Sequence, residues 1–467
     1  MSSLFSSLNA ALQSMLTHQK SIQVIEHNVA HANTPGYHRQ EVKLGTSSAT
    51  PAPTLYHTVS AGQIGGGVTA DMVKRFNVTF YDGRFRTQTA LAERWEGTSQ
   101  TLSHVESILA ETSSGGMINQ LDAFWNAWQT LADDPTNLAF RSGLLQDTQS
   151  LTNSLNRRAG DLIQIRRDID QEIVQDVQDL NQLAGEIARL NGEIANITSM
   201  DLQPNDLLDE RDRLLDQLAE YSDLSVGTQE NGEVLVSLGG HALVVGREIF
   251  QLETNPDPAN SNLAAVTWED GQAFHPVEGT LTARLTSRDE VIPDLLAGLD
   301  DVAGTLITEV NALHQTGYGL DNSTGLNYFS GSDALSIELS PDISSLEKIA
   351  GASDPDSPGD SSLAAAITDL QHQELLNGGS ETFTSYFANQ VAGLGTRIQN
   401  ARSRAANSGL VVQSLQMQRE SVIGVSLDQE AANLVKSQRA FEAAARLTTA
   451  IDEMLDRIIN GMGLVGR

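Results

Sequence analysis

The sequence predicts an elongated, mainly α-helical protein with inserted β structure: a helical-bundle and coiled-coil body made from both termini, plus a small β-rich outer domain. Apolar residues recur at heptad spacing at both ends of the chain, long helical repeats fill most of the remainder, and short β-branched runs appear in the middle. The expected division is a terminal coiled-coil assembly region (1–40 and 425–467), a helical body (41–220, 285–318 and 362–424), and a β-rich outer domain with an acidic loop (221–284 and 319–361).

The first 32 residues predict a long helix with a coiled-coil seam, because their apolar side chains recur at alternating three- and four-residue steps. The helix is expected to end near Ala32, since Pro35 favours an extended residue before it and Gly36 permits a positive φ. A helix of this length is marginal in water without a partner, so the seam must be covered. The assembly residues expected on this seam are Leu4, Leu8, Met15, Ile22, Ile25 and Val29.

The C-terminal residues supply a candidate partner, because a strict seven-residue apolar repeat runs through positions 427–462. Roughly ten buried apolar side chains at about 1.5 kcal/mol each would stabilise the pairing strongly. Two interpretations stay open: an ordinary pair of bundle helices, or an assembly surface shared with neighbouring subunits. The assembly residues expected on this seam are Leu427, Leu434, Phe441, Leu455, Ile458 and Met462.

The charge balance argues against two classes of partner. The chain has 29 Lys and Arg against 60 Asp and Glu, a net charge of −31, whereas a nucleic-acid-binding surface needs a basic footprint. The same acidity opposes docking on an anionic membrane. We therefore expect neither nucleic acid nor a membrane as a partner, and a solvated, self-repelling surface is the simplest interpretation.

The absence of cysteine and the pattern of the N-terminus further restrict the class of protein that the sequence can encode. The chain has no cysteine, which excludes disulfides and cysteine metal sites. The N-terminus lacks the basic region and unbroken apolar stretch of a Sec signal peptide, and no apolar run approaches the roughly 18 residues of a membrane span. If the protein is exported, we expect another route to carry it.

In the middle of the chain the spacing of apolar residues changes from helical to strand-like and then back to helical. Residues 76–220 read as helices with breaks at Gly115-Gly116 and at 133–135, and Asn181 and Asn191 punctuate a long apolar seam at places where buried Asn fixes register. Strand patterns follow from 221 to 268, separated by glycine turns, and residues 279–285 read as a closing strand. Helical periodicity returns over 291–314, and from 362 it is expected to hold to the C-terminus apart from Gly378-Gly379. Two further short strands are expected at 40–44 and 68–73.

No catalytic or metal site is expected. His27 and His31 have the i, i+4 spacing of helical metal ligands, but no glutamate follows His27 and no third ligand is nominated. The run 321–325 begins like a calcium loop, yet its glycine comes one position early and the terminal glutamate is missing. Without a nucleophile elbow or a phosphate-binding loop, the sequence predicts a non-enzyme that needs no cofactor.

Four stretches carry a resemblance to a known family. Residues 28–40, which read NVAHANTPGYHRQ, resemble the N-terminal signature of flagellar axial proteins, the rod, hook and hook-associated proteins. Residues 204–212 (PNDLLDERD), 311–318 (NALHQTGY) and the ending over 428–441 resemble the hook-associated protein 1 family. His31 and His38 depart from the family pattern, in which small or polar residues are usual. The resemblance assigns the turn out of the inner tube to Asn33, Thr34, Pro35, Gly36 and Tyr37.

The resemblance implies a structural adaptor that forms a ring at the hook–filament junction of the bacterial flagellum and is required for filament assembly and motility. It implies self-assembly through the terminal helices, with these helices near a tube axis and the β domain outside. The implied partners are further copies of the chain, the hook protein below, a second hook-associated junction protein above, and an export chaperone on the C-terminal helix. The implied location is the extracellular flagellum, reached through the flagellar type III pathway without a cleaved signal peptide.

Two alternatives remain at the level of the sequence. Another axial protein of the hook or distal rod would share the signature at 33–37, but the long helical body and the motif at 205–209 count against it. A secreted cell-wall hydrolase on an axial-protein scaffold would need an extra domain with a polar catalytic cluster. The inserted β region is short for such a domain.

Overall fold

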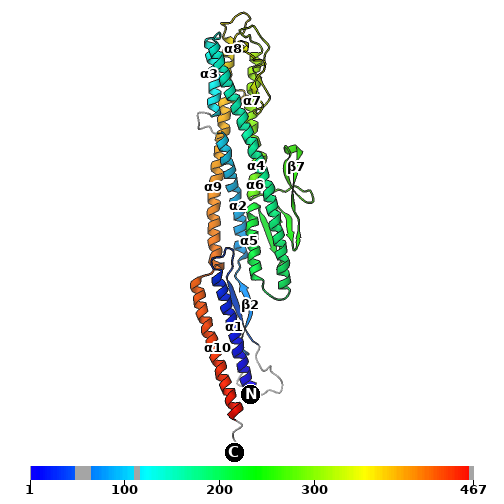
Figure 1. Ribbon diagram of the computed structural model, residues 1–467, viewed down its shortest axis with the longest axis vertical. Helices are drawn as coiled ribbons and strands as arrows, with labels where there is room; N and C mark the ends of the chain where they lie inside the picture. The colour runs from blue at the N-terminus through cyan, green and yellow to red at the C-terminus, as the bar shows by residue number, and fades with distance from the viewer. Residues whose placement is uncertain (1, 48–64, 110–115, 462–467) are drawn as a thin grey trace, which may run out of the picture.

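The computed structural model describes residues 2–47, 65–109 and 116–461 of a long, narrow molecule with both chain ends at one pole (Figure 1). Three parts follow one another along its axis: a terminal region that holds the two chain ends, a helical body, and a tip at the far pole. A small β region lies against one side of the body. We keep these four names below.

The terminal region consists of two antiparallel helices and a hairpin. Helix α1 (Ser2–Ala30) packs along α10 (Leu427–Gly461) on one side and against the antiparallel strands β1 (Gln40–Thr46) and β2 (Val68–Arg75) on another. The strands were expected, but their place differs from the predicted division, which put them in the body. The reason is local: β1 follows α1 after a tight turn and folds back on it.

The body is a bundle of long helices. Helix α2 (Thr79–Leu109) runs beside α9 (Phe383–Ile423), and α4 (Leu138–Thr198) extends over 61 residues, which is about 90 Å of helix. Side chains cap the helix starts: the Asn137 carboxamide accepts from the Ala139 amide at 3.0 Å, and Thr382 forms a capping box with Ser385. Two further helices complete the body, α5 (Asn205–Tyr221) and α7 (Ile292–His314).

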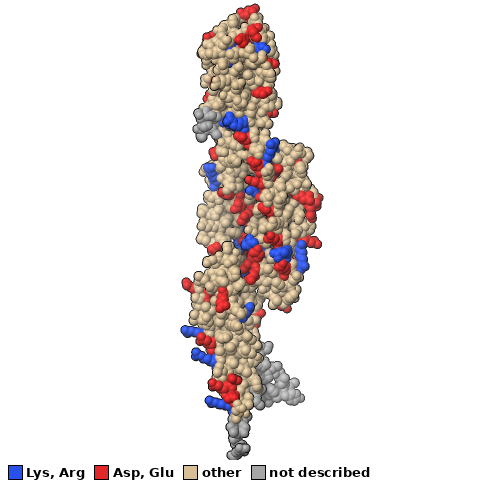
Figure 2. Space-filling view, viewed as in Figure 1, with Lys and Arg blue, Asp and Glu red and all other residues tan. Residues whose placement is uncertain are grey.

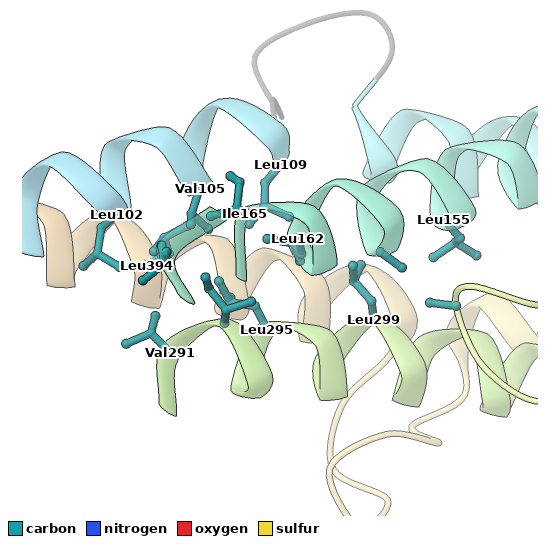
Figure 3. Close-up of a cluster of buried hydrophobic side chains, with 14 of the residues drawn as sticks. Leu102, Val105, Leu109, Leu155, Leu162, Ile165, Val291, Leu295, Leu299 and Leu394 are labelled. Carbon is teal, nitrogen blue, oxygen red and sulfur yellow. The ribbon is translucent and has the colours of Figure 1, made fainter. Parts of the chain in front are cut away.

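Four helices bury one continuous apolar core in the body. Figure 3 shows Leu102 and Val105 of α2 facing Leu162 of α4 and Leu394 of α9, with Leu295 of α7 closing the cluster. Each of these side chains is less than a tenth exposed. The predicted apolar seam over 169–197 continues this core, since its residues are buried or half-buried along α4.

The tip closes the bundle with aromatic side chains and loops. Helices α3 (Met117–Asp133) and α8 (Ser362–Asp369) lie there, and Trp125, Trp128 and Tyr328 are fully buried between them and α4. Residues 319–361 cover this pole and contain only two strands of two residues each, β9 (Phe329–Ser330) and β10 (Glu338–Leu339).

The position of residues 319–361 differs from the prediction, which joined them to the β region. Arg141 of α4 explains the position: its buried guanidinium donates to the carbonyls of Pro135, Leu346 and Ile349 at 2.5–3.1 Å and so ties the loop to the tip. Asn156 similarly donates to three carbonyls between residues 334 and 337. The far pole is therefore a loop-covered helical tip, and the β region lies on the flank.

The β region is a four-stranded antiparallel meander plus a two-stranded ribbon. Asn231-Gly232 and Gly239-Gly240 make the predicted turns, with φ of +86° at Gly232. Two asparagines of α4 dock it: Asn181 exchanges two hydrogen bonds with the Leu252 backbone, and Asn191 does the same with Val234. The strands are β3 (Leu224–Thr228), β4 (Val234–Leu238), β5 (His241–Val245), β6 (Glu248–Ile249), β7 (Leu252–Asp257) and β8 (Leu263–Trp268).

Two further predictions were wrong in secondary structure. Residues 279–285 were predicted as a strand, but helix α6 (Thr280–Thr286) occupies this stretch. Gly279 (φ +91°) turns the chain against Tyr221, and Leu281 and Ala283 then bury one helical face. A π-helical turn, Ser287–Val291, links α6 to α7. The C-terminal helix is also not continuous: it breaks at 424–426 between α9 and α10, where a Cβ on Gly424 would lie 2.4 Å from the Glu420 carbonyl oxygen.

Candidate assembly interface

The helices α1 and α10 form a pair within one chain. Helix α1 packs along α10, and Ala11 and Ile25 of α1 and Ile451 and Leu455 of α10 are buried. The Thr448 hydroxyl also lies 3.7 Å from the Met15 sulfur across the pair. The heptad pattern therefore has a partner inside the chain.

The outward sides of the same two helices remain apolar and exposed. Phe5, Leu12 and Leu16 of α1 are each about half exposed, and so are Leu447 and Met454 of α10. These five residues define what we call the outer stripes. In a two-helix pair such stripes have nothing within the described chain to cover them, which is typical of a surface that another protein buries.

The predicted seam residues divide between the two sides of the pair. Ile25 and Leu455 are buried, whereas Val29 (44 %) and Leu427 (55 %) are exposed, because the buried position near the end of α1 belongs to Asn28 instead of Val29. Met462 lies outside the described residues. The remaining predicted residues are half-buried: Leu4, Leu8, Met15, Ile22, Leu434, Phe441 and Ile458.

The predicted turn motif follows α1 directly. The Thr34 amide donates to the His31 carbonyl at 2.9 Å, and Gly36 adopts a φ of +79°, which a residue with a Cβ rarely adopts. The Tyr37 hydroxyl donates to the Asn28 carboxamide at 2.7 Å and lies 2.9 Å from His27 Nδ1. The turn is thus fastened back onto the last helical turn of α1.

Side-chain contacts near this turn fasten α1 to β1 and join the N-terminal segment to α10. The Asn28 side chain exchanges hydrogen bonds of 2.8 and 2.9 Å with the Gln40 backbone, as a neighbouring strand would. Glu430, the buried carboxylate at the start of α10, accepts from Arg39 at 2.8 Å and from Asn28 at 3.2 Å. The start of α10 is therefore held by the segment that links α1 to β1.

A cluster of charged residues joins the terminal region to the body. Arg75 of β2 lies 2.5 Å from Asp209 and 2.6 Å from Asp212, both of α5. Arg86 of α2 shares Asp212 at 3.1 Å. The His38 amide and imidazole also contact Asp209. Burial raises the pKa of Asp212, but the two guanidinium groups outweigh it and hold that pKa at about 2.

The same cluster reaches the end of α9. The Arg419 guanidinium donates to Asp216 at 2.6 Å and lies over the Phe85 ring, 5.1 Å from its centre. Its Nε is also 2.8 Å from Asp82 Oδ1, an ion pair without the alignment of a hydrogen bond. We call Arg75, Arg86, Arg419, Asp82, Asp209, Asp212 and Asp216 the junction cluster.

The structure brings together two motifs that lie far apart in the sequence. Residues 33–38 and residues 205–212 meet at the junction cluster, where Gln40 also accepts from Asn205 at 3.1 Å. Sequence reasoning singled out both motifs but did not predict their contact. Arg75, Arg86 and Arg419 were missed, since single arginines in helices and strands carry no spacing signal.

The histidine pair of α1 has a structural partner. The rings of His27, His31 and Tyr37 pack together with centroid separations of 4.6–5.6 Å. Within the described residues no group of three or more His, Cys, Asp or Glu is arranged to hold a metal ion. In the run 321–325, whose sequence begins like a calcium loop, the Asp321 side chain accepts from the Ser323 amide at 3.0 Å and so forms a turn. Over the same part of the chain, no helix combines the length and the apolar character needed to cross a bilayer.

Comparisons with known proteins show which proteins the chain resembles. Residues 102–329 match the helical domain of the flagellar hook-associated protein FlgK, and residues 421–461 match the C-terminal part of flagellar basal body rod proteins of the FlgEFG type. The chain is 29 % identical to flagellar hook-associated protein 1 of Bacillus subtilis, with all of both chains covered. It is 24 % identical to the protein of the same name from Escherichia coli, over 97 % of this chain and 99 % of that one.

A solved structure shares the fold. The flagellar hook junction protein FlgK from Burkholderia pseudomallei superposes with a TM-score of 0.65, covering 73 % of this chain and all of that one at 14 % identity. The long helices from both termini and the small sheets are consistent with that neighbour. The chain is therefore similar over essentially its whole length to proteins named flagellar hook-associated protein 1, and residues 102–329 match the FlgK helical domain.

Proposed function

We propose that the protein is a structural, non-enzymatic component of the bacterial flagellum at the hook–filament junction, where copies of it assemble through the terminal region. Relatives named flagellar hook-associated protein 1 match 97–100 % of the chain, which supports the proposal. The observation that carries the proposal is the outer stripes: Leu12 and Leu16 on α1, and Leu447 and Met454 on α10, are exposed although the inner side of the same pair is buried.

The same surface suits the other partners that we propose. A neighbouring copy, the hook protein and a second hook-associated protein would each bury apolar area against it. Before export, a chaperone on α10 would shield Leu447 and Met454, since exposed apolar stripes promote aggregation. We also propose that the flagellar type III pathway transports the chain to the extracellular flagellum.

The test separates assembly from folding. We expect Leu447→Glu with Met454→Glu to abolish filaments and motility while the α1–α10 pair stays helical, because both side chains are about half exposed and neither belongs to the buried side of the pair. Electron microscopy of hook ends and circular dichroism of the purified chain measure the two effects. Cells that swim normally with this variant would contradict the proposal.

A second variant probes the inner side. Leu434→Asp with Phe441→Asp should also abolish assembly, but here through the loss of α1–α10 pairing, while the body remains folded. Glu453→Gln, an exposed change on α10, serves as the matched control and should leave motility intact.

A further inference from the structure

The helix α9 is unusual within this acidic chain. Residues 383–419 contain no Asp or Glu and four arginines, whereas the whole chain carries −31. Beyond Ile398, α9 buries one side against α2 and leaves the other open, with Leu410 65 % and Met417 58 % exposed. We call this open side the α9 face.

Two arginines on α9 lack a carboxylate partner within the described residues. Arg402 donates to the Ser103 hydroxyl at 3.0 Å, and Arg404 lies over the Trp95 ring, 4.6 Å from its centre. Both residues are exposed. Since they are two positions apart, they lie on opposite flanks of the α9 face, and no described carboxylate neutralises either charge.

An acidic groove of about 320 Å³ opens between α2, α4, α5 and α6. Among the described residues that line it, Arg284 is the one basic group, and it pairs with Glu172 and Asp176 of α4. The carboxylates without such a partner are Glu93 and Glu96 of α2 and Glu220 of α5. Acidic side chains gather over the middle of the face in Figure 2.

Electrostatics at the groove show an excess of negative charge. Burial raises the pKa of Glu93 and of Glu220, and nearby carboxylates raise both further. A basic group placed in the groove would relieve this repulsion.

The α9 face and the groove lie at one height on different sides of α2. Trp95 turns toward Arg404 of α9, while Glu93, two positions earlier, turns toward Glu220 of α5. Copies placed side by side along their long axes would therefore bring Arg402 and Arg404 of one copy to the level of Glu93 and Glu96 of the next.

We propose that neighbouring copies of this chain associate side by side through a heterologous contact, in which the α9 face of one copy lies on the acidic groove of the next. This inference rests on the proposed self-assembly and names the second surface that it uses. The arginines of α9 supply the charge that the groove lacks, and burial of Leu410 and Met417 removes apolar surface from water. Heterologous contacts of this kind generate rings or helical arrays.

Cysteine cross-linking tests the contact, because the natural chain has no cysteine. We expect Gln100→Cys with Asn407→Cys to give a ladder of covalent oligomers when isolated flagella are oxidised, and each single variant to give none. Dimers from Asn407→Cys alone would overturn the inference in favour of a two-fold contact. Flagella that contain the double variant but yield no ladder would overturn it while leaving the proposed function intact. Absence of the unaltered chain from flagella would instead defeat the proposed function.

Charge reversal sharpens the test. Arg402→Glu with Arg404→Glu, and separately Glu93→Arg with Glu96→Arg, should each lower the cross-linked fraction by about tenfold or more. All four changes together should restore it, since the two surfaces have then exchanged charge. Arg157→Glu with Glu269→Arg, outside both surfaces, is the matched control. A four-residue variant no better than either pair would overturn the inference.

Discussion

The terminal region and the body differ in charge and in what covers them. Residues 1–78 and 424–467 together hold 10 basic and 9 acidic residues, whereas residues 79–423 hold 19 basic and 51 acidic. The rest of the molecule, which comprises the body, the tip and the β region, thus carries essentially the whole negative charge and buries its own core. The terminal region is nearly neutral and exposes apolar stripes. A self-repelling body stays soluble, while a neutral terminal region packs against other proteins without charge repulsion.

The two parts also differ in what holds them together. Within the described residues, the continuous apolar core runs from Leu102 to Ile398 and includes no residue of α1, β1, β2 or α10. Charged contacts of the junction cluster take its place between the terminal region and the body. Ion pairs keep the two parts in a fixed relation without extending the core.

The largest expected effect is a cavity in the body core. Leu162→Ala should lower the free energy of unfolding by about 3 kcal/mol, because Leu162 is fully buried among four helices. Leu447→Ala in the terminal region should change it by less than about 0.5 kcal/mol, since Leu447 is half exposed. Urea denaturation measures both. Equal losses would contradict the contrast between the two parts.

Removal of one charge from the junction cluster should come next. Asp212→Asn leaves Arg75 and Arg86 short of a carboxylate, so about 3 kcal/mol of local stability should be lost between the terminal region and the body. Limited proteolysis near residue 76, compared before and after the change, detects the loosening. Glu193→Gln, which breaks the exposed pair with Arg189, is the control and should have little effect.

Acid should destabilise the tip before the junction cluster. Burial lowers the pKa of His314 to about 4, below its usual 6.5, and its Nε2 accepts from the Ala350 amide at 2.9 Å. The neutral ring therefore contributes stability that is fully present above pH 6.5 and is lost as the pH falls to about 4, by about 3 kcal/mol in total. Denaturation across this range measures the loss. His314→Gln should flatten the dependence, and an unchanged slope would exclude His314 as its source.

A smaller effect is expected where the β region docks on α4. Asn181→Ala removes two hydrogen bonds to the Leu252 backbone and should destabilise the β region locally by about 1–2 kcal/mol. Hydrogen exchange of residues 252–268 should accelerate while the core helices stay protected. Asn153→Ala, an exposed change on the same helix, should leave exchange unchanged.

The smallest expected effect is a difference in hydrogen exchange within the unaltered chain. In the purified monomer, hydrogen exchange should be faster in α1 and α10 than in α4, because a two-helix pair with exposed stripes buries little apolar surface. Protection should rise in assembled flagella. Equal protection of α10 and α4 in the monomer would mean that the terminal pair is already complete and that assembly uses other surfaces.

Four asparagines that bond to the backbone of a neighbouring segment differ in whether the local sequence predicted a role for them. Asn181 and Asn191 stood out because they interrupt an apolar seam, and the structure shows each pairing with the backbone of a strand. Asn28 and Asn311 do the same with Gln40 and Phe329; both begin motifs quoted for the family resemblance, but neither was expected to pair with a backbone.

The sequence by itself determined most helices, the main glycine turns and the acidic character of the middle, because periodicity, turn residues and charge are local properties. It did not determine the break at 424–426 or the helix at 280–286, where backbone crowding and packing decide.

Tertiary structure alone decided that α1 and α10 pair within one chain, that residues 319–361 cover the far pole, and that residues 33–38 meet residues 205–212. Each of these depends on contacts between segments more than one hundred residues apart, such as the 2.9 Å approach of His38 to Asp209. Such contacts follow from the packing of the whole chain, and local sequence does not encode them in a readable pattern.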